Sequence, residues 1–268
     1  MLIGDVVGKA GRRAVQEHLG AIVKARGGVD LVIANGENSA AGLGITPKIA
    51  SELFRVGVDV ITTGNHVWRR QEVFGFLDTD QRILRPQNYP PGAPGRGLLV
   101  METASGARVA VLNLLGRVFM DPMDCPFRAA DAVLEGMTLG RDVNAIIVDF
   151  HAEATSEKVA MGHYLDGRVS AVLGTHTHVP TADHRILPGG TGFQCDVGMV
   201  GDFDSVIGMG VETVLPRFLT GLPTRFEPAE GPATLCATLV RVDARSGRCR
   251  GVEPLRGGAT LDSGIGER

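Results

Sequence analysis

The stretch Leu31-Val32-Ile33-Ala34-Asn35-Gly36-Glu37-Asn38 joins an apolar run of strand length to a group of polar residues that can bind metals. Four other apolar runs end in the same way, with Met1-Leu2-Ile3 followed by Gly4-Asp5, Val60-Ile61 by Thr62-Thr63-Gly64-Asn65-His66, Ile146-Ile147-Val148 by Asp149-Phe150-His151, and Val172-Leu173 by Gly174-Thr175-His176-Thr177-His178. Ligands of open α/β sheets collect beyond the carboxyl ends of the strands. We therefore expect these five strand ends to converge on one site.

Helix-like segments separate the first of these runs. Residues 11–25 carry apolar side chains at helical spacing, and Thr46-Pro47 provides an N-cap and a first-turn proline for a helix that Gly57 ends. A shorter helix is expected over residues 68–77. This alternation of strands and helices predicts a largely parallel sheet in the first half of the chain.

The second half adds antiparallel strands. Residues 97–102 and 108–115 flank Ala104-Ser105-Gly106, and residues 237–242 and 249–255 flank Ser246-Gly247, so each pair predicts a hairpin. Between these hairpins, a helix is expected over residues 155–165. Residues 85–96 read as a surface loop, and residues 120–127 as an irregular lid or rim.

These elements together predict an α/β fold in which two mixed sheets pack face to face with helices outside. We expect a single domain over residues 1–268, with residues 256–268 as a flexible tail. The length is sufficient for a full hydrophobic core.

The composition excludes several classes of protein. A net charge of −3 gives no electrostatic reason for stable binding to nucleic acid or to an anionic membrane. The first residues do not show the basic region followed by an apolar region that is typical of a signal peptide, and no uninterrupted apolar run approaches the ~18 residues that a membrane span needs. The four cysteines form no C-x-x-C pair and read as reduced thiols. We expect a cytoplasmic protein.

The residue types at the strand ends indicate metal chemistry. Asn and Asp after a strand are common in turns, so each residue taken singly has that ordinary explanation. Five such ends together favour a site. Carboxylate, amide oxygen and imidazole donors suit iron, manganese, zinc or magnesium better than a cysteine-rich zinc site. Two ions ~3.5–4 Å apart would hold a hydroxide and clamp the oxygens of an in-line phosphoryl displacement, which predicts phosphoester hydrolysis.

The ordered motifs resemble those of the calcineurin-like metallophosphoesterases, and more closely their bacterial YmdB-like branch. The stretches typical of that branch are Ile3-Gly4-Asp5-Val6-Val7-Gly8, Ala34-Asn35-Gly36-Glu37-Asn38, Asp149-Phe150-His151-Ala152-Glu153-Ala154-Thr155-Ser156-Glu157-Lys158 and Asp196-Val197-Gly198-Met199. The resemblance extends from residue 2 to about residue 254. It implies a four-layer α-β-β-α sandwich, in agreement with the fold expected above.

The resemblance also implies a role for each site residue. One ion would be held by Asp5, Glu37, Asn38 and His178, and the other by Glu37, Asn65, His151 and His176, with Glu37 bridging the two. His66 matches the catalytic histidine that protonates the leaving alkoxide or stabilises the transition state. Iron or manganese is the expected metal, with zinc or magnesium as alternatives.

The chain departs from the wider superfamily in two places. The usual Asp-x-His is here Asp5-Val6-Val7, and the usual bridging Asp is Glu37, so that Asn38 takes the place of a missing imidazole. Both departures fit the YmdB-like branch. Loss of an imidazole makes the first site richer in oxygen and leaves the identity of its metal open.

We therefore expect a phosphodiesterase that acts on small phosphodiesters, with 2′,3′-cyclic nucleotides as the favoured class. Two alternatives remain at the level of sequence. The same site would serve a phosphomonoesterase or phosphoprotein phosphatase, and a regulatory protein could bind a nucleotide or RNA there with little turnover. The expected partner is a small-molecule phosphoester, without a membrane or a stably bound nucleic acid, and a homo-oligomer is left open.

Overall fold

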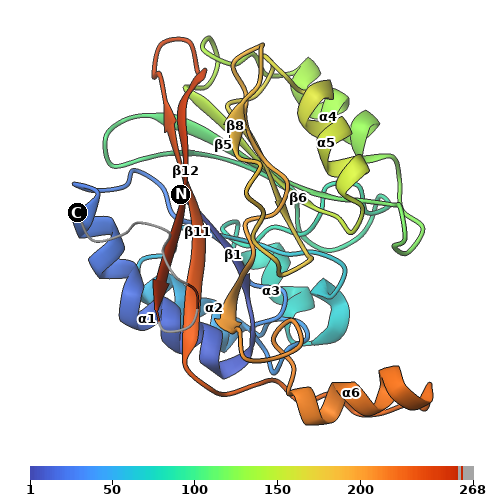
Figure 1. Cartoon of the computed structure of the whole chain (residues 1–268). Coiled ribbons are helices and arrows are strands. Elements are labelled where there is room, and N and C mark those ends of the chain that lie inside the picture. The colour runs from blue at the N-terminus through green and yellow to red at the C-terminus, as the bar shows by residue number, and fades with distance from the viewer. Residues whose placement is uncertain (259–260, 262–268) are drawn as a thin grey trace.

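Two six-stranded sheets pack face to face in the computed structural model, which describes residues 1–258 and 261 (Figure 1). The strands of the first sheet lie in the order β12 (Cys249–Gly258), β11 (Ala233–Val242), β10 (Met199–Asp202), β1 (Leu2–Val6), β2 (Ile33–Asn35) and β3 (Val60–Thr62). Those of the second lie in the order β4 (Leu98–Glu102), β5 (Arg108–Leu115), β6 (Ala145–His151), β7 (Ala171–Thr175), β9 (Gly192–Gln194) and β8 (Arg185–Ile186).

Both sheets are mixed, as the sequence predicts. Strands β10, β1, β2 and β3 run parallel to one another, and so do β5, β6, β7 and β9. The hairpins β4–β5 and β11–β12 add the antiparallel pairs at the expected positions. The parallel strands occupy the centre of the second sheet, and in the first sheet they extend to its edge at β3.

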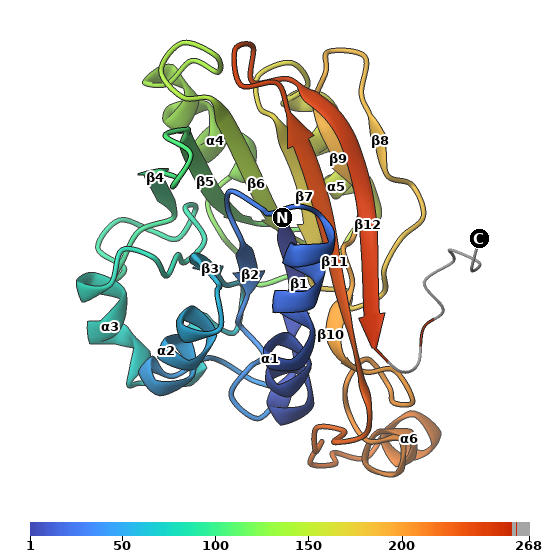
Figure 2. The ribbon, with the colours of Figure 1, turned by 90° about the vertical axis from the view of Figure 1, so that its left-hand side faces the viewer.

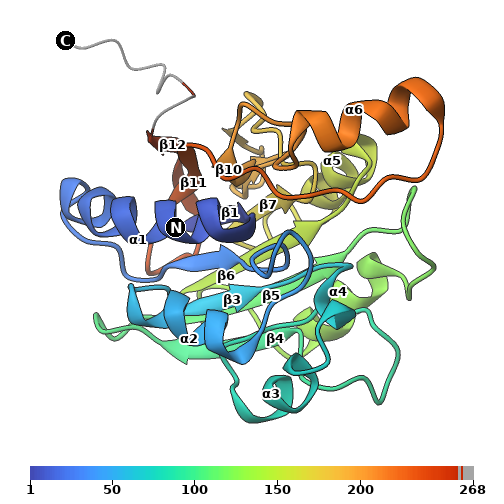
Figure 3. The ribbon, with the colours of Figure 1, turned by 90° about the horizontal axis from the view of Figure 1, so that it is seen from below.

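Helices cover the outer face of each sheet (Figures 2 and 3). Helices α1 (Gly8–Ala25), α2 (Pro47–Arg55) and α3 (Val73–Thr79) lie beside the first sheet, and α4 (Pro126–Glu135) and α5 (Thr155–Tyr164) beside the second. Thr46 caps α2 through its Oγ1, which accepts a hydrogen bond from the backbone N–H of Ile49 at 3.3 Å. The predicted N-terminus of this helix is therefore confirmed.

Three buried hydrophobic clusters fill the three spaces between the four layers. Successive side chains of a strand point to opposite faces, so Ile3 packs toward the helices of the first sheet while Leu2 packs toward the second sheet. Leu2 and Val111, which come from different sheets, belong to one cluster between them. A third cluster joins the second sheet to α5 through Met161. The predicted α-β-β-α sandwich is confirmed, and the single domain stays a prediction that the shared inner cluster supports.

Several predicted boundaries are wrong. The helix expected over residues 68–77 is a 3₁₀ turn, η1 (Val67–Arg69), followed by α3 after a break. The predicted surface loop over residues 85–96 is partly buried, because Arg85 donates to the backbone oxygens of Pro86 at 2.8 Å and Pro94 at 3.2 Å. The irregular segment gives way to α4 at Pro126, since proline suits a first helical turn.

The carboxyl-terminal hairpin is longer than expected. Strand β12 continues to Gly258, so residues 256–258 belong to a strand and not to the predicted tail. Residues 259–260 and 262–268 of that tail lie outside the described residues. Helix α6 (Val211–Thr220), which the sequence does not predict, stands out from the sandwich (Figure 1). Within the described residues, no helix has the length and apolarity that a membrane span requires.

Candidate metal centre

The five predicted strand ends meet at one edge of the sandwich. The site residues are placed along them as follows: Asp5 in β1, Glu37 and Asn38 after β2, Asn65 and His66 after β3, His151 at the end of β6, and His176 and His178 after β7. Strands β1 to β3 belong to the first sheet, and β6 and β7 to the second. The site therefore lies at the carboxyl ends of parallel strands from both sheets, as the sequence predicts.

The imidazole of His151 is the centre of one group of ligand-type atoms. Its Nε2 lies 2.9 Å from Glu37 Oε1, 3.0 Å from His176 Nδ1 and 3.2 Å from Asn65 Oδ1. The ligand atoms of Glu37, His151 and His176 all lie within 4.8 Å of one another. Side chains from three loops and from the end of β6 thus place donor atoms in one small volume.

A second group lies next to the first and is richer in oxygen. Asp5 Oδ2 accepts a hydrogen bond from the backbone N–H of His176 at 3.0 Å, while its Oδ1 lies 3.7 Å from His151 Nδ1. Asn38 donates through Nδ2 to the backbone oxygen of Gly42 at 2.9 Å, which leaves its Oδ1 as the free end of the amide. His178 Nδ1 lies 2.8 Å from the backbone oxygen of Ile207. Because a carbonyl only accepts, Nδ1 carries the proton and Nε2 has a free lone pair.

The two groups fit bound cations. Among the described residues, the buried atoms Asp5 Oδ1 and Asn38 Oδ1 have no hydrogen-bond partner. A buried acceptor without a donor costs roughly 1–3 kcal/mol, and a cation removes that cost. Carboxylate and amide oxygens beside imidazole nitrogens are suitable ligands for iron, manganese, zinc or magnesium.

Burial and mutual contact shift the pKa values of these residues. Burial raises the pKa of Asp5 to about 6 and lowers that of His176 to about 3. For Glu37 and His151, burial opposes the charged forms but their contact outweighs it. The imidazole of His151 lowers the pKa of Glu37 to about 2, and the carboxylate of Glu37 raises that of His151 to about 9. Without an ion, the two therefore form a buried ion pair.

Buried hydrogen bonds fix the orientation of His151. Its Nδ1 lies 2.9 Å from Thr175 Oγ1, which donates to Asp149 Oδ1 at 2.7 Å. Asn35 Nδ2 donates to Asp149 Oδ2 at 3.1 Å. Since the threonine hydroxyl gives its proton to the carboxylate, its oxygen accepts from Nδ1 of the imidazole. This arrangement leaves Nε2 to face the ligand group, as outer hydrogen bonds do for many metal-binding histidines.

The turn that contains His176 and His178 has a strained backbone, and hydrogen bonds to Asp196 hold it in place. His176 has φ 102° and His178 has φ 66°, values that non-glycine residues rarely adopt. Asp196 Oδ2 accepts hydrogen bonds from the backbone N–H of Thr177 at 3.0 Å and from its Oγ1 at 2.7 Å. Lys158 Nζ contacts the same oxygen at 2.7 Å. The two imidazoles have different neighbours, since His176 contacts His151 and His178 contacts Ile207.

His66 lies beside the ligand group without joining it. Its backbone N–H donates to Glu37 Oε2 at 3.0 Å, and its buried Nδ1 has no partner in the described part of the chain. Burial lowers the pKa of this imidazole. Gly64, two residues earlier, lets the chain pass close to the ligands, because a Cβ there would lie 2.2 Å from His151 Cδ2 and 2.4 Å from Glu37 Oε2.

A pocket of about 530 Å³ opens beside the site residues. Glu37, His66 and His178 line one side of it. Sequence reasoning missed two parts of this pocket. Glu153, within the quoted motif after β6, places Oε2 3.1 Å from His176 Nε2. The opposite wall is apolar and comes from residues 206–226, where the sequence gives no periodic signal that connects them to the site.

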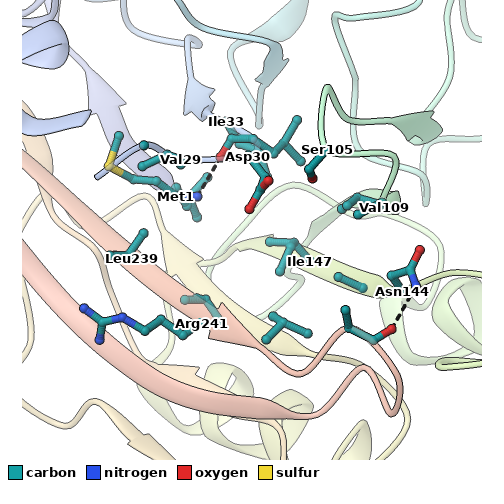
Figure 4. A pocket seen from close by; sticks show the side chains of 18 of the residues that line it. Met1, Val29, Asp30, Ile33, Ser105, Val109, Asn144, Ile147, Leu239 and Arg241 are labelled. Carbon is teal, nitrogen blue, oxygen red and sulfur yellow. Dashed lines mark hydrogen bonds between the residues drawn. The ribbon is translucent and has the colours of Figure 1, made fainter. Parts of the chain in front are cut away.

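A second cavity of about 390 Å³ lies at the other ends of the strands (Figure 4). Met1, Ile33, Val109, Ile147 and Leu239 are among the side chains that line it. They come from both sheets, and their apolar character fits the space between two packed sheets. None of the eight site residues is among the described residues that line this cavity, so the chemistry belongs to the first pocket.

Comparison with known proteins agrees with the resemblance seen in the sequence. The family model described as YmdB-like protein matches residues 1–255. A curated relative from Bacillus subtilis strain 168, named 2′,3′-cyclic-nucleotide 2′-phosphodiesterase, is 46% identical over 253 residues. The match covers 94% of this chain and 94% of that protein.

Two solved structures share the fold over nearly the whole chain. A crystal structure of a hypothetical protein from Thermus thermophilus has a TM-score of 0.89 at 47% identity and covers 97% of this chain and 98% of that one. A novel phosphatase from Mycoplasma pneumoniae also has a TM-score of 0.89, at 36% identity, and covers 96% of this chain and 92% of that one. The names of the Bacillus subtilis and Mycoplasma pneumoniae proteins agree with the phosphoric ester hydrolase that the sequence predicts.

Proposed function

This chain belongs to the YmdB-like protein family, and we propose that it is a metal-dependent phosphodiesterase that hydrolyses small phosphodiesters, with 2′,3′-cyclic nucleotides as the substrate class. The observation that carries the proposal is the convergence of Glu37, Asn65 and His176 on Nε2 of His151, beside the buried and unpaired Oδ1 of Asp5. The name of the Bacillus subtilis relative supports the choice of substrate class.

Two ions are proposed, with one shared ligand. The proposed ligands of the first are Asp5, Glu37, Asn38 and His178, and those of the second are Glu37, Asn65, His151 and His176. Bound ions supply Lewis-acid polarisation of the phosphoryl oxygens and make a water nucleophilic at neutral pH. Iron or manganese is the proposed metal, as the family resemblance implies, and zinc or magnesium are the alternatives. Oxygen and imidazole donors without thiolate are compatible with all four.

Residues of the chain itself are proposed to orient the ligands and to assist the leaving oxygen. The backbone N–H of His66 donates to Oε2 of Glu37 and so orients the carboxylate that would be shared by the two ions. The His66 imidazole lines the pocket and is proposed to donate a proton or a hydrogen bond to the leaving oxygen. The bonds from Asp149 through Thr175 keep Nε2 of His151 directed at the ligand group.

Elemental analysis of the purified protein, coupled to an activity assay, tests the proposal. We expect about two metal ions per chain and hydrolysis of 2′,3′-cyclic AMP and of bis-p-nitrophenyl phosphate. Faster hydrolysis of p-nitrophenyl phosphate than of the diester would favour a phosphomonoesterase instead. Tight binding of the cyclic nucleotide to metal-replete protein, without any product, would contradict an enzymatic role.

A further inference from the structure

The pocket beside the metal centre has one apolar wall. Its side chains come from the segment before α6, from α6 itself and from the loop after it, namely Val206, Ile207, Met209, Val214, Phe218 and Phe226. The two phenylalanines are 76% and 38% exposed, although they lie next to a site that carries several charged groups. Exposed aromatic side chains at the mouth of a pocket mark a surface that a ligand can cover.

The wall is attached to the ligand-bearing turn. Nδ1 of His178 donates to the backbone oxygen of Ile207 at 2.8 Å, so one residue faces both the proposed ions and the wall. The backbone N–H of Gly210 donates to the backbone oxygen of Glu227 at 2.8 Å, and that of Ala229 to Gly208 at 2.9 Å. These bonds hold the segment before α6 against the segment after Phe226.

One cationic side chain accompanies the aromatic rings. The guanidinium carbon of Arg217 lies 5.5 Å from the centre of the Phe226 ring, and Arg217 lines the same pocket. A planar cation beside an exposed phenyl ring is a combination that stacks well on the flat, polar-edged ring of a nucleobase. A simple phosphomonoester would leave this wall uncovered.

We infer that the apolar wall is a nucleobase subsite, on which Phe226 and Phe218 stack the base while the cyclic phosphodiester occupies the metal centre. The inference rests on the proposed function and deepens it. The pocket is continuous from His66 to Phe226, and its volume of about 530 Å³ is within the range of small-ligand pockets. One bound molecule can therefore place a phosphoryl group at one end and an aromatic ring at the other.

Kinetics of the metal-loaded enzyme on two substrates test the subsite. We choose 2′,3′-cyclic AMP and glycerol 1,2-cyclic phosphate, because both contain a five-membered cyclic phosphodiester and only the first has a base. Phe226→Ala should raise KM for the nucleotide about 5- to 150-fold, the range measured for one lost base–aromatic stack, and leave kcat/KM for the glycerol compound within about twofold. Phe226→Trp keeps an aromatic face and should retain the wild-type KM.

Leu219→Ala is the matched control. Leu219 is 76% exposed on the same helix as Phe218 but does not line the pocket. Its truncation should therefore leave KM and kcat/KM unchanged for both substrates. A measurement on wild-type protein avoids variants altogether. Adenosine should inhibit hydrolysis of the glycerol compound competitively, and ribose should not.

The outcomes separate the subsite from the proposed function. If wild-type protein hydrolyses both substrates with equal kcat/KM and adenosine does not inhibit, the subsite is wrong and the phosphodiesterase stands. If wild-type protein hydrolyses neither, the proposed function is wrong and the subsite fails with it. If Phe218→Ala and Leu219→Ala both convert an oligomer to monomers in sedimentation without any kinetic effect, a second copy of the chain covers the wall and the inference is overturned.

Discussion

Lys158 Nζ lies 2.7 Å from Asp196 Oδ2, and both side chains are only 1% exposed. The same carboxylate oxygen holds the backbone N–H and the hydroxyl of Thr177. Thr177 stands between His176 and His178, whose backbone is strained. Neither member of the ion pair is a proposed ligand, yet together they support the turn that carries two of the proposed ligands, His176 and His178.

Asp196→Ala should strongly destabilise the protein. The substitution leaves the ammonium of Lys158 buried without its partner, and breaking a buried pair in this way typically costs about 3–5 kcal/mol. It also frees the turn at Thr177, so we expect weaker metal binding at a given metal concentration. Urea denaturation of the metal-free protein measures the first effect, and elemental analysis after dialysis the second.

Arg168→Ala is the control for this prediction. Its partner Asp131 lies 2.8 Å away, but both side chains are at least a third exposed, so losing this pair should cost less than about 1 kcal/mol. Equal destabilisation by Asp196→Ala and Arg168→Ala would show that the buried pair contributes no more to the free energy of unfolding than the exposed pair.

Gly64→Ala should remove metal and activity together. A Cβ at this position would lie 2.2 Å from His151 Cδ2, 2.3 Å from its Nε2 and 2.4 Å from Glu37 Oε2, so the proposed ligands must move apart. Elemental analysis and turnover of 2′,3′-cyclic AMP measure the loss. The matched control is Gly75→Ala in α3, where nothing lies within 4 Å of the added Cβ and alanine favours the helix by up to about 1 kcal/mol. Full metal content in Gly64→Ala would contradict the assignment of His151 and Glu37.

The strand ends of the site could be predicted from the sequence, for a physical reason. Buried parallel strands read as short apolar runs, and their carboxyl ends meet at one edge of each sheet. Asp5 and His151 therefore point to a common site, although more than half of the chain separates them. The assignment of each ligand to one of two ions came from the family resemblance and stays a prediction.

The apolar wall of the pocket and the ion pair that supports the turn at Thr177 could not be predicted from the sequence. The hydrogen bond from His178 to Ile207 joins residues 29 apart, and the pair of Lys158 and Asp196 joins residues 38 apart. Such contacts depend on how loops pack in three dimensions, which no local periodicity records. Helix α6 also contains Pro216, a residue that argues against a helix in its interior.

Metal binding should release at least one proton per chain at pH 7.5. In the metal-free protein, Glu37 raises the pKa of His151 to about 9, so the imidazole is protonated at that pH and must lose a proton before it can bind an ion. His176, with a pKa of about 3, is already neutral. Titration of Mn²⁺ by calorimetry in two buffers of different ionisation enthalpy measures the release, and the contribution of His151 should fall as the pH rises through about 9.

The same shift sets the pH dependence of stability without metal. The folded-state pKa of His151 lies above its ordinary value of 6.5, so the stabilisation from this group is complete below pH 6.5 and is lost as the pH rises through about 9. Metal-free protein should therefore become less stable between pH 7 and pH 9, while metal affinity increases over the same range. A metal affinity that is constant from pH 6.5 to 9 would contradict protonation of His151.

His66→Ala should abolish most turnover while the metal content stays unchanged. The contact from this residue to Glu37 runs through the backbone N–H, which alanine keeps, so the proposed bridging carboxylate remains in place. What is lost is the imidazole, and the loss of a general acid typically lowers kcat by about 10²–10⁴-fold. With 2′,3′-cyclic AMP the leaving group is a ribose alkoxide, which needs a proton. With bis-p-nitrophenyl phosphate it is p-nitrophenolate, a stable anion, so the defect should be much smaller. An equal defect in kcat on both substrates would show that His66 does not act by protonating the leaving oxygen.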